Sequence, residues 1–341
     1  MKYLIFRSDR IGDFLITSPL IQSIKRNDKN HFIEVVCSSK NNNFVNNLNL
    51  VDKIHVLKKN NFISKLKLFL NLKANTYDVI FVSDKKNRSI ILSFFLKSKV
   101  KIFNVSKLFI YNFLKFFHMN VFLDNDVSPF AIKEIQEKNL NCINFKLIKE
   151  DFYFFRKNQF KNYFKKNNDF DFPENFILVH YDEKWEIQAY IKSFNKAKNF
   201  VNLEIEYNTF VKFLFEISNK THLNIIITTG TINTNFVNKF INAAEKISSN
   251  VYKLEKDSNH IFCIKNQSFE SVSHLISYSK FFISCHGAFT HIAAAYKIKQ
   301  IDIINADKEY HYNRITSSID NYSAIFRKKF QNLSIDIINL L

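Results

Sequence analysis

The segment Arg7–Pro19 carries the residue types best suited to chemistry in the first half of the chain. It follows a short apolar run, Tyr3–Phe6, which is expected to form a strand, and it precedes a helical pattern. Gly12 would open that helix, with Asp13 directly after it and Arg10 close by. A carboxylate at such an edge of a sheet can act as a general base on an attacking hydroxyl group. A carboxylate can equally cap the positive end of the helix, so both roles of Asp13 stay open.

Glycine occurs only three times, at Gly12, Gly230 and Gly287, whereas average proteins contain about 7% glycine. Each glycine lies shortly after an expected strand and before a helical pattern. Glycine is needed there when φ is positive or when a ligand approaches the backbone closely. Helix N-termini at the carboxyl edge of an open α/β sheet also favour phosphate groups. The sequence therefore predicts ligand contacts at these turns, and the alternative is that the glycines only make turns.

Further polar residues follow expected strands of the second half. Lys184 comes shortly after one such strand and could neutralise a phosphate, or it could be a solvated surface lysine. His286 and His291 flank Gly287 and could donate to a phosphate oxygen, although a histidine at a helix start often has a structural role. Trp185, the single tryptophan, is expected to pack in the core. No histidine or cysteine spacing is typical of a metal site, so none is expected.

The composition bounds the class of protein. A formal net charge of +18 would attract anions, but the basic residues are mostly lysine within a Lys/Asn-rich composition and are dispersed. No zinc, RRM or basic-helix signature is present, so a nucleic-acid partner is not expected. The four cysteines indicate reduced thiols, and neither a signal peptide nor a long apolar run is evident. We expect a cytoplasmic protein.

Short apolar runs alternate with amphipathic stretches, which indicates an α/β fold built from βαβ units with parallel sheets. The polar segment Lys157–Asp171 separates two such series, and domains are expected at 1–165 and 166–341, with the last helix packing back on the first domain. The tail Thr316–Leu341 is expected to be helical. The expected strands are Tyr3–Phe6, Phe32–Cys37, Lys53–Val56, Val79–Val82, Lys101–Val105, Phe176–His180, Asn224–Thr228, Val251–Leu254, Phe281–Ser284 and Gln300–Ile304.

The segment Arg7–Pro19 resembles the N-terminal motif of glycosyltransferase family 9, which contains the ADP-heptose:lipopolysaccharide heptosyltransferases. It matches as a strand followed by R-x-D-x-I-G-D and then by T-x-P inside the first helix. The resemblance extends through Lys53 and resumes in the second half, but over most of residues 57–170 only the rhythm of elements matches. It implies the GT-B architecture, two facing Rossmann-like domains with parallel sheets. It also implies inversion at the sugar without a metal ion, with Asp13 as the catalytic base.

The segment Phe281–Ala295 is similar to the second motif of that family, D-[ST]-G-x-x-H-[LI]-A-A-A, which holds the diphosphate of the donor. Cys285 stands in place of the aspartate, His286 in place of Ser or Thr, and His291 one residue later than in the motif. Thr229 and Gly230 resemble the family's strand-end glycine turn. The residues expected to bind the donor are Arg10, Gly12, Lys184, Thr229, Gly230, His286, Gly287, Ala288, Thr290 and His291.

The function that the resemblance implies is transfer of a heptose or related sugar from a nucleotide-sugar, with ADP as the implied nucleotide, to a lipopolysaccharide core or another surface glycan. No other cofactor is expected. The departures in the second motif, Cys285 above all, leave open a non-catalytic nucleotide- or glycan-binding protein on the same scaffold.

Two stretches of the first half combine aromatic and basic residues, Phe62–Lys73 and Lys107–Phe117. In an enzyme with a lipid-linked acceptor, such surfaces could rest on an anionic membrane. The alternative is that both are ordinary helices whose apolar faces cover the sheet. The membrane interpretation requires apolar side chains that remain exposed once the core is filled.

Overall fold

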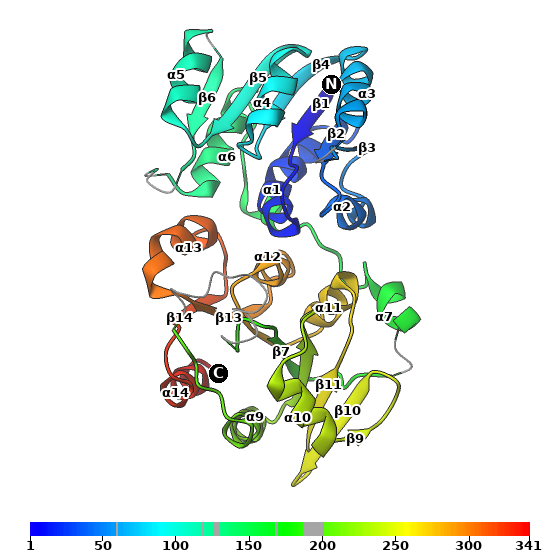
Figure 1. The fold of residues 1–341 in the computed structure, drawn as a ribbon, viewed down its shortest axis with the longest axis vertical. Helices are drawn as coiled ribbons and strands as arrows, with labels where there is room; N and C mark the ends of the chain where they lie inside the picture. The colour runs from blue at the N-terminus through cyan, green and yellow to red at the C-terminus, as the bar shows by residue number, and fades with distance from the viewer. Residues whose placement is uncertain (59–60, 118, 126–127, 129, 168–169, 187–200) are drawn as a thin grey trace. The chain divides into compact units, whose positions relative to one another are not determined.

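The computed structural model describes residues 1–58, 61–117, 119–125, 128, 130–167, 170–186 and 201–341. The chain divides into two compact units (Figure 1). Unit 1 comprises Met1–Phe154 and Asn313–Ser318, and unit 2 comprises Phe155–Tyr312 and Ile319–Leu341. Phe155 begins unit 2 because its ring stacks on Tyr296 and contacts Phe160, so the division falls earlier than residues 165–166.

Unit 1 is a six-stranded parallel sheet in the order β3-β2-β1-β4-β5-β6. Its strands are β1 (Lys2–Phe6), β2 (Phe32–Cys37), β3 (Lys53–Val56), β4 (Thr76–Val82), β5 (Lys97–Val105) and β6 (Asn120–Leu123). Its helices are α1 (Ile11–Asn27), α2 (Asn42–Leu48), α3 (Phe62–Lys73), α4 (Asn87–Phe94), α5 (Leu108–Phe116) and α6 (Ile132–Asn141), with a 3₁₀ turn at η1 (Lys149–Phe152). The order of strands reverses between β1 and β4, which is where open α/β sheets bind ligands.

Helices α3, α4 and α5 cover one face of this sheet. Their inward residues Leu72, Ile90 and Leu114 belong to one buried cluster with Leu4 and Phe6 of β1. Right-handed crossovers place α1 and α2 on the opposite face, because the chain there moves across the sheet in the other direction. The outward sides of α3, α4 and α5 therefore belong to one side of unit 1.

Unit 2 is an eight-stranded sheet in the order β14-β13-β12-β7-β8-β11-β10-β9. Its strands are β7 (Phe176–Tyr181), β8 (Asn224–Thr229), β9 (Glu245–Lys246), β10 (Val251–Lys256), β11 (Asn259–Ile264), β12 (Phe281–Cys285), β13 (Lys299–Ile304) and β14 (Tyr322–Phe326). Its helices are α7 (Lys161–Asn167), α9 (Tyr207–Thr221), α10 (Asn235–Ala243), α11 (Phe269–Ile276), α12 (Ala288–Ala295), α13 (Glu309–Thr316, whose last residues group with unit 1) and α14 (Phe330–Leu340), with a 3₁₀ turn at η3 (Ala306–Lys308). The α/β architecture of two Rossmann-like units is thus confirmed.

The sheet of unit 2 is not wholly parallel, which corrects the expectation for this half. The predicted strand Val251–Leu254 is part of β10, which pairs antiparallel with both β9 and β11. A tight turn with positive φ at Asp257 and Ser258 leads into β11, and β11 takes the parallel position beside β8. The six parallel strands then repeat the order found in unit 1.

The C-terminal segment also differs from expectation, because it is not helical throughout. Strand β14 extends the sheet beside β13, and only α14 continues as a helix. Helix α14 belongs to unit 2, where Phe330 contacts the rings of Phe210 and Phe213. The expectation that the last helix packs on the first domain is therefore wrong. The C-terminal segment that groups with unit 1 is Asn313–Ser318. Among the described helices, none is both long and apolar enough to span a membrane.

Candidate active site

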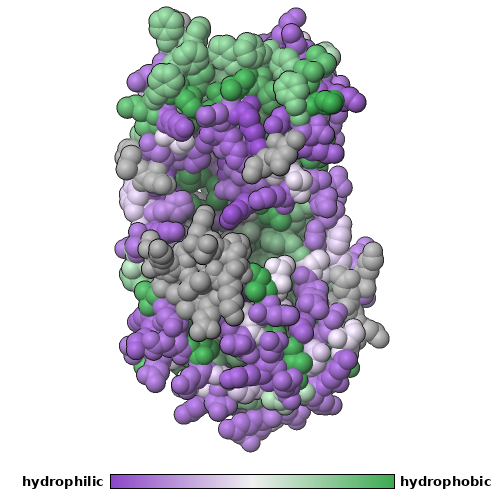
Figure 2. All heavy atoms as spheres, viewed as in Figure 1, coloured by the Kyte–Doolittle hydropathy of each residue, from purple (hydrophilic) through white to green (hydrophobic). Residues whose placement is uncertain are grey.

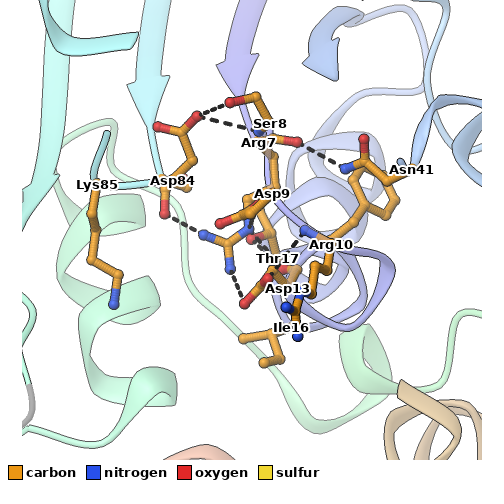
Figure 3. A network of polar contacts seen from close by, with 12 residues as sticks. Arg7, Ser8, Asp9, Arg10, Asp13, Ile16, Thr17, Asn41, Asp84 and Lys85 are labelled. Carbon is orange, nitrogen blue, oxygen red and sulfur yellow. Dashed lines mark hydrogen bonds and ion pairs between the residues drawn. The ribbon is translucent and has the colours of Figure 1, made fainter. Parts of the chain in front are cut away.

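Arg7 organises the carboxyl edge of the sheet in unit 1 (Figure 3). Its buried guanidinium donates to the backbone carbonyl of Asp13 at 2.7 Å and to that of Ser83 after β4. It also lies 3.4 Å from the carboxylate of Asp9 and 3.6 Å from that of Asp13. One cation thereby joins the ends of β1 and β4 to the first turn of α1.

Asp84, which the sequence analysis missed, anchors the same edge. Its Oδ2 accepts hydrogen bonds from the hydroxyl of Ser8 at 2.5 Å and from that of Ser89 at 2.6 Å. The carboxylate is buried, and it fixes the segment after β1 against the segment after β4 (Figure 3). Its position just beyond an expected strand was the available signal, but only the pairing of β1 with β4 brings it beside Ser8.

Asp13 caps α1 and keeps its carboxylate partly exposed. Its Oδ2 accepts the backbone N–H of Arg10 at 3.2 Å, which caps α1. Its side chain is nevertheless 40% exposed, and the contact with Arg7 restricts its orientation. A carboxylate that is held in place and open to solvent can still accept a proton from a bound hydroxyl group.

Asp9 is the second acid beside Arg7. The pKa of Asp9 is raised to about 6, because burial and the carboxylates of Asp13 and Asp84 together outweigh the lowering by Arg7 and Lys86. The group therefore titrates close to neutral pH, within the network that also holds Asp13.

Several cations line the same edge of unit 1. Lys86 donates to the carbonyl of Ser8 at 2.8 Å, and burial lowers the pKa of Lys86. Arg88 donates to the hydroxyl of Ser8 at 3.1 Å. Arg10, predicted as a donor ligand, is exposed at the start of α1. The edge thus offers positive charge beside the carboxylate of Asp13.

Positive φ, one of the two reasons expected for the glycines, is wrong for all three, and close packing of other side chains is seen at Gly230 and Gly287. None of the three has a positive φ, and Gly12 lies inside the first turn of α1. A Cβ on Gly230 would lie 3.0 Å from the Cβ of Asp182, and one on Gly287 would lie 3.0 Å from the Nζ of Lys184. Both positions are crowded by residues of the β7–α9 connection.

Lys184 is the best-defined donor-site candidate in unit 2. Its ammonium donates to the carbonyl of His286 at 2.8 Å and pairs with the carboxylate of Asp182 at 2.9 Å. Burial alone would lower the pKa of Lys184, but the carboxylate of Asp182 outweighs it and the pKa lies above its ordinary value. The charge is therefore fixed beside Gly287, at the N-terminus of α12, where helix N–H groups and the dipole also favour an anion.

His286 is paired with Asp302, a residue that the sequence analysis missed. The Nδ1 of His286 lies 2.6 Å from a carboxylate oxygen of Asp302, which also accepts from the hydroxyl of Tyr322 at 2.9 Å. Asp302 lies on β13 opposite Ser284, on the other face of the sheet from Cys285, which pairs with Ile303. The ring of His286 is also 5.8 Å from that of His291.

The other predicted residues of this motif differ in accessibility. Thr290 is fully buried. Its hydroxyl accepts the backbone N–H of Gly287 at 3.2 Å and donates to the carboxylate of Asp302 at 3.3 Å. The side chain therefore caps α12 and is not a surface ligand. Ala288 is the first residue of α12 and is partly exposed. Thr229 is the buried last residue of β8, opposite Tyr181.

Cys285 is structural. It is buried, and burial raises the pKa of its thiol to about 12. Its Sγ lies 3.4 Å from the guanidinium of Arg327, which also donates to the backbone carbonyl of Lys184. Trp185 is buried, as predicted, and stacks on Tyr181. Across the described ranges, no group of three or more potential metal ligands is found.

No family model and no curated protein matches the sequence. Solved structures do match. E. coli ADP-heptose lipopolysaccharide heptosyltransferase II is 11% identical with a TM-score of 0.66, covering 100% of this chain and 98% of that one. E. coli heptosyltransferase WaaC with ADP is 13% identical (TM-score 0.61; 99% and 97% covered), and a family 9 glycosyltransferase from Veillonella parvula is 9% identical (0.58; 98% and 88%).

A second group of structures shares the fold. UDP-GlcNAc 2-epimerase from Neisseria meningitidis, bound to UDP-GlcNAc, is 13% identical with a TM-score of 0.53, covering 100% of this chain and 91% of that one. The resemblance stated from the sequence is thus confirmed at the level of fold. Because transferases and epimerases share this fold, the reaction has to be argued from the residues.

Proposed function

We propose that this chain is a glycosyltransferase that moves a sugar from a nucleotide-sugar to a hydroxyl group of a glycan. The observation that carries the proposal is the carboxylate of Asp13, which is exposed and yet held by Arg7 and the N-terminus of α1. A merely structural cap does not require an open face or a network of charged neighbours.

In the proposed reaction, Asp13 takes the proton from the acceptor hydroxyl as its oxygen bonds to the anomeric carbon. The bond from that carbon to the nucleotide diphosphate breaks, and the electron pair leaves with the diphosphate, so the anomeric configuration inverts. Lys184 and the first turn of α12 would neutralise the leaving charge within unit 2. Their preorganised position, set by Asp182, favours that role.

The proposed donor is an ADP-linked heptose or a related sugar, and the proposed acceptor is a lipopolysaccharide core or another surface glycan. Support comes from the solved structures of WaaC with ADP and with ADP-2-deoxy-2-fluoro heptose, together with the motif at Arg7–Pro19. The pair of His286 and Asp302 offers a second polar contact beside the donor phosphates.

The test has two stages. Thermal shift with ADP, UDP, GDP and CMP identifies the base, and we expect ADP to give the largest stabilisation. The matching nucleotide-sugars are then incubated with truncated glycolipid acceptors, and transfer is followed by mass spectrometry. Binding without transfer to any acceptor would favour the non-catalytic alternative. Conversion of UDP-GlcNAc to its 2-epimer without an acceptor would replace the proposal by epimerase activity.

A further inference from the structure

The outward sides of α3 and α5 in unit 1 carry large apolar side chains where surface helices normally carry polar ones. On α3, Phe62, Leu66 and Leu70 recur at every fourth position and are exposed, Phe62 by 77%. On α5, Phe109 and Phe116 are 80% and 78% exposed. The core of unit 1 is already filled by the inward sides of these helices, so the exposed rings are not needed to cover the sheet.

These side chains form one surface, which we call the aromatic face. Figure 2 shows a band of hydrophobic side chains across the end of unit 1 at the top of the view. Aromatic contacts connect α4 to α5, because the ring of Phe94 lies 5.6 Å from that of Phe117 and 6.4 Å from that of Phe113. The exposed members of the aromatic face are Phe62, Ile63, Leu66, Leu70, Ile91, Phe95, Leu108, Phe109, Phe113, Phe116 and Phe117.

The charge at the aromatic face has one sign. Helices α3, α4 and α5 contain no aspartate or glutamate. Exposed lysines accompany the apolar side chains, with Lys67 and Lys73 on α3 and with Lys107 and Lys115 at α5. Lysine is depleted at protein–protein interfaces, whereas a bilayer with anionic lipids offers an apolar layer under a negative surface that attracts lysine.

We propose that the aromatic face docks unit 1 on a membrane that contains anionic lipids, with the rings entering the interface and the lysines contacting the headgroups. Each lysine near such a surface raises the partition coefficient about fivefold, which corresponds to about 1 kcal/mol. The proposal does not depend on the sugar-transfer reaction, because docking requires neither donor nor acceptor.

The test is co-sedimentation of the full chain with vesicles of phosphatidylcholine alone or with 30% phosphatidylglycerol (about the anionic content that makes a surface strongly negative). We expect binding to the anionic vesicles and at least a tenfold weaker partition for the double variant Phe109→Ser/Phe116→Ser. The matched control, Ile335→Ser/Leu340→Ser, removes two exposed apolar residues from α14 in unit 2 and should bind like the parent.

A second pair of variants tests the charge. Lys107→Gln/Lys115→Gln should lower the partition into anionic vesicles at least tenfold, whereas Lys246→Gln/Lys256→Gln in unit 2 should not. Far-UV circular dichroism confirms folding of each variant. Equal binding to both vesicle types, or a variant of the aromatic face that binds like the parent, would overturn the proposal. A dimer that dissociates in the Phe109→Ser/Phe116→Ser variant, without vesicle binding by the parent, would assign the face to a second copy instead.

Discussion

At the scale of single residues, Asp13 is the proposed general base, and Arg7 and the N-terminus of α1 hold its carboxylate. We expect Asp13→Asn to lower transfer by about 10²–10⁴-fold, as the loss of a general base does. Donor affinity should stay within about threefold, because a base acts on the acceptor and asparagine can still cap α1. Steady-state kinetics and calorimetric titration measure the two quantities. Asp171→Asn, which changes an exposed carboxylate in unit 2, serves as the control. Transfer at the parental rate would reduce Asp13 to a cap.

The acid beside it has a consequence for stability. Because the pKa of Asp9 is raised to about 6 in the fold, its ionisation disfavours the folded state as pH rises from about 4 through 6. Asp9→Asn should therefore stabilise unit 1 at pH 7.5, by on the order of 2 kcal/mol, and should add little at pH 4.5, where Asp9 is protonated. Thermal unfolding at both pH values measures this difference. An equal effect at the two pH values would show that ionisation of Asp9 is not the cause.

Donor binding should depend on the contact between Gly287 and Lys184. The backbone at Gly287 is extended, so Gly287→Val is not expected to strain the main chain. Its side chain would instead displace the ammonium of Lys184 from the start of α12. We expect the dissociation constant of the nucleotide to rise more than tenfold, as for the loss of a hydrogen bond to a charged group.

Lys184→Met should weaken nucleotide binding at least as much as Gly287→Val, and Lys280→Met, at an exposed lysine of unit 2, should leave it unchanged. Calorimetric titration of folded protein measures all three. Unchanged affinity in both Gly287→Val and Lys184→Met would place the nucleotide elsewhere.

At the scale of elements, apolar runs of the sequence correspond to strands in the middle of both sheets, among them β1, β7, β8 and β12. Strand β2 has the predicted bounds, and so does β3, although β3 is an edge strand without a buried residue. Strand β14, an edge strand with one buried residue, was not predicted, because the whole segment Thr316–Leu341 was expected to be helical. Strand β11 begins with the polar pair Asn259 and His260, and its role depends on a hairpin that only the fold reveals.

Only part of the candidate site could be predicted from the sequence. The position of Asp13 after a strand and before a helix could be read from spacing alone. Asp84, Asp182 and Asp302 could not, because each acts on a residue that strand pairing or a turn brings close. Residue type suggested positive φ or close approach of a ligand at the glycines; φ is not positive at any of them, and side chains crowd Gly230 and Gly287.

Helix α14 should contribute strongly to unit 2 through one side chain. Phe330 is buried against Phe210 and Phe213, so Phe330→Ala should lower the free energy of unfolding by about 3–5 kcal/mol. Ile335→Ala, at an exposed position of the same helix, should change it by less than about 0.5 kcal/mol. Urea titration gives both values, and a small effect of Phe330→Ala would mean that α14 is held mainly by other contacts.

At the scale of the whole molecule, the two units repeat one strand order without a recognisable repeat in their sequences. Each unit has its own buried cluster, so each has the apolar interior that independent stability requires. What differs is the surface: the aromatic face belongs to unit 1, whereas the fixed ammonium of Lys184 belongs to unit 2.

The single tryptophan gives unit 2 an optical signal of its own. Trp185 is buried, stacks on Tyr181 and donates from its indole N–H to the carbonyl of His180. It directly follows Lys184 in the chain, so a nucleotide that engages that ammonium would alter the surroundings of the only indole. Tryptophan fluorescence, excited at the red edge of protein absorbance, should therefore report donor binding to unit 2 and the thermal unfolding of unit 2. Unit 1 contains no tryptophan and should not contribute to this signal.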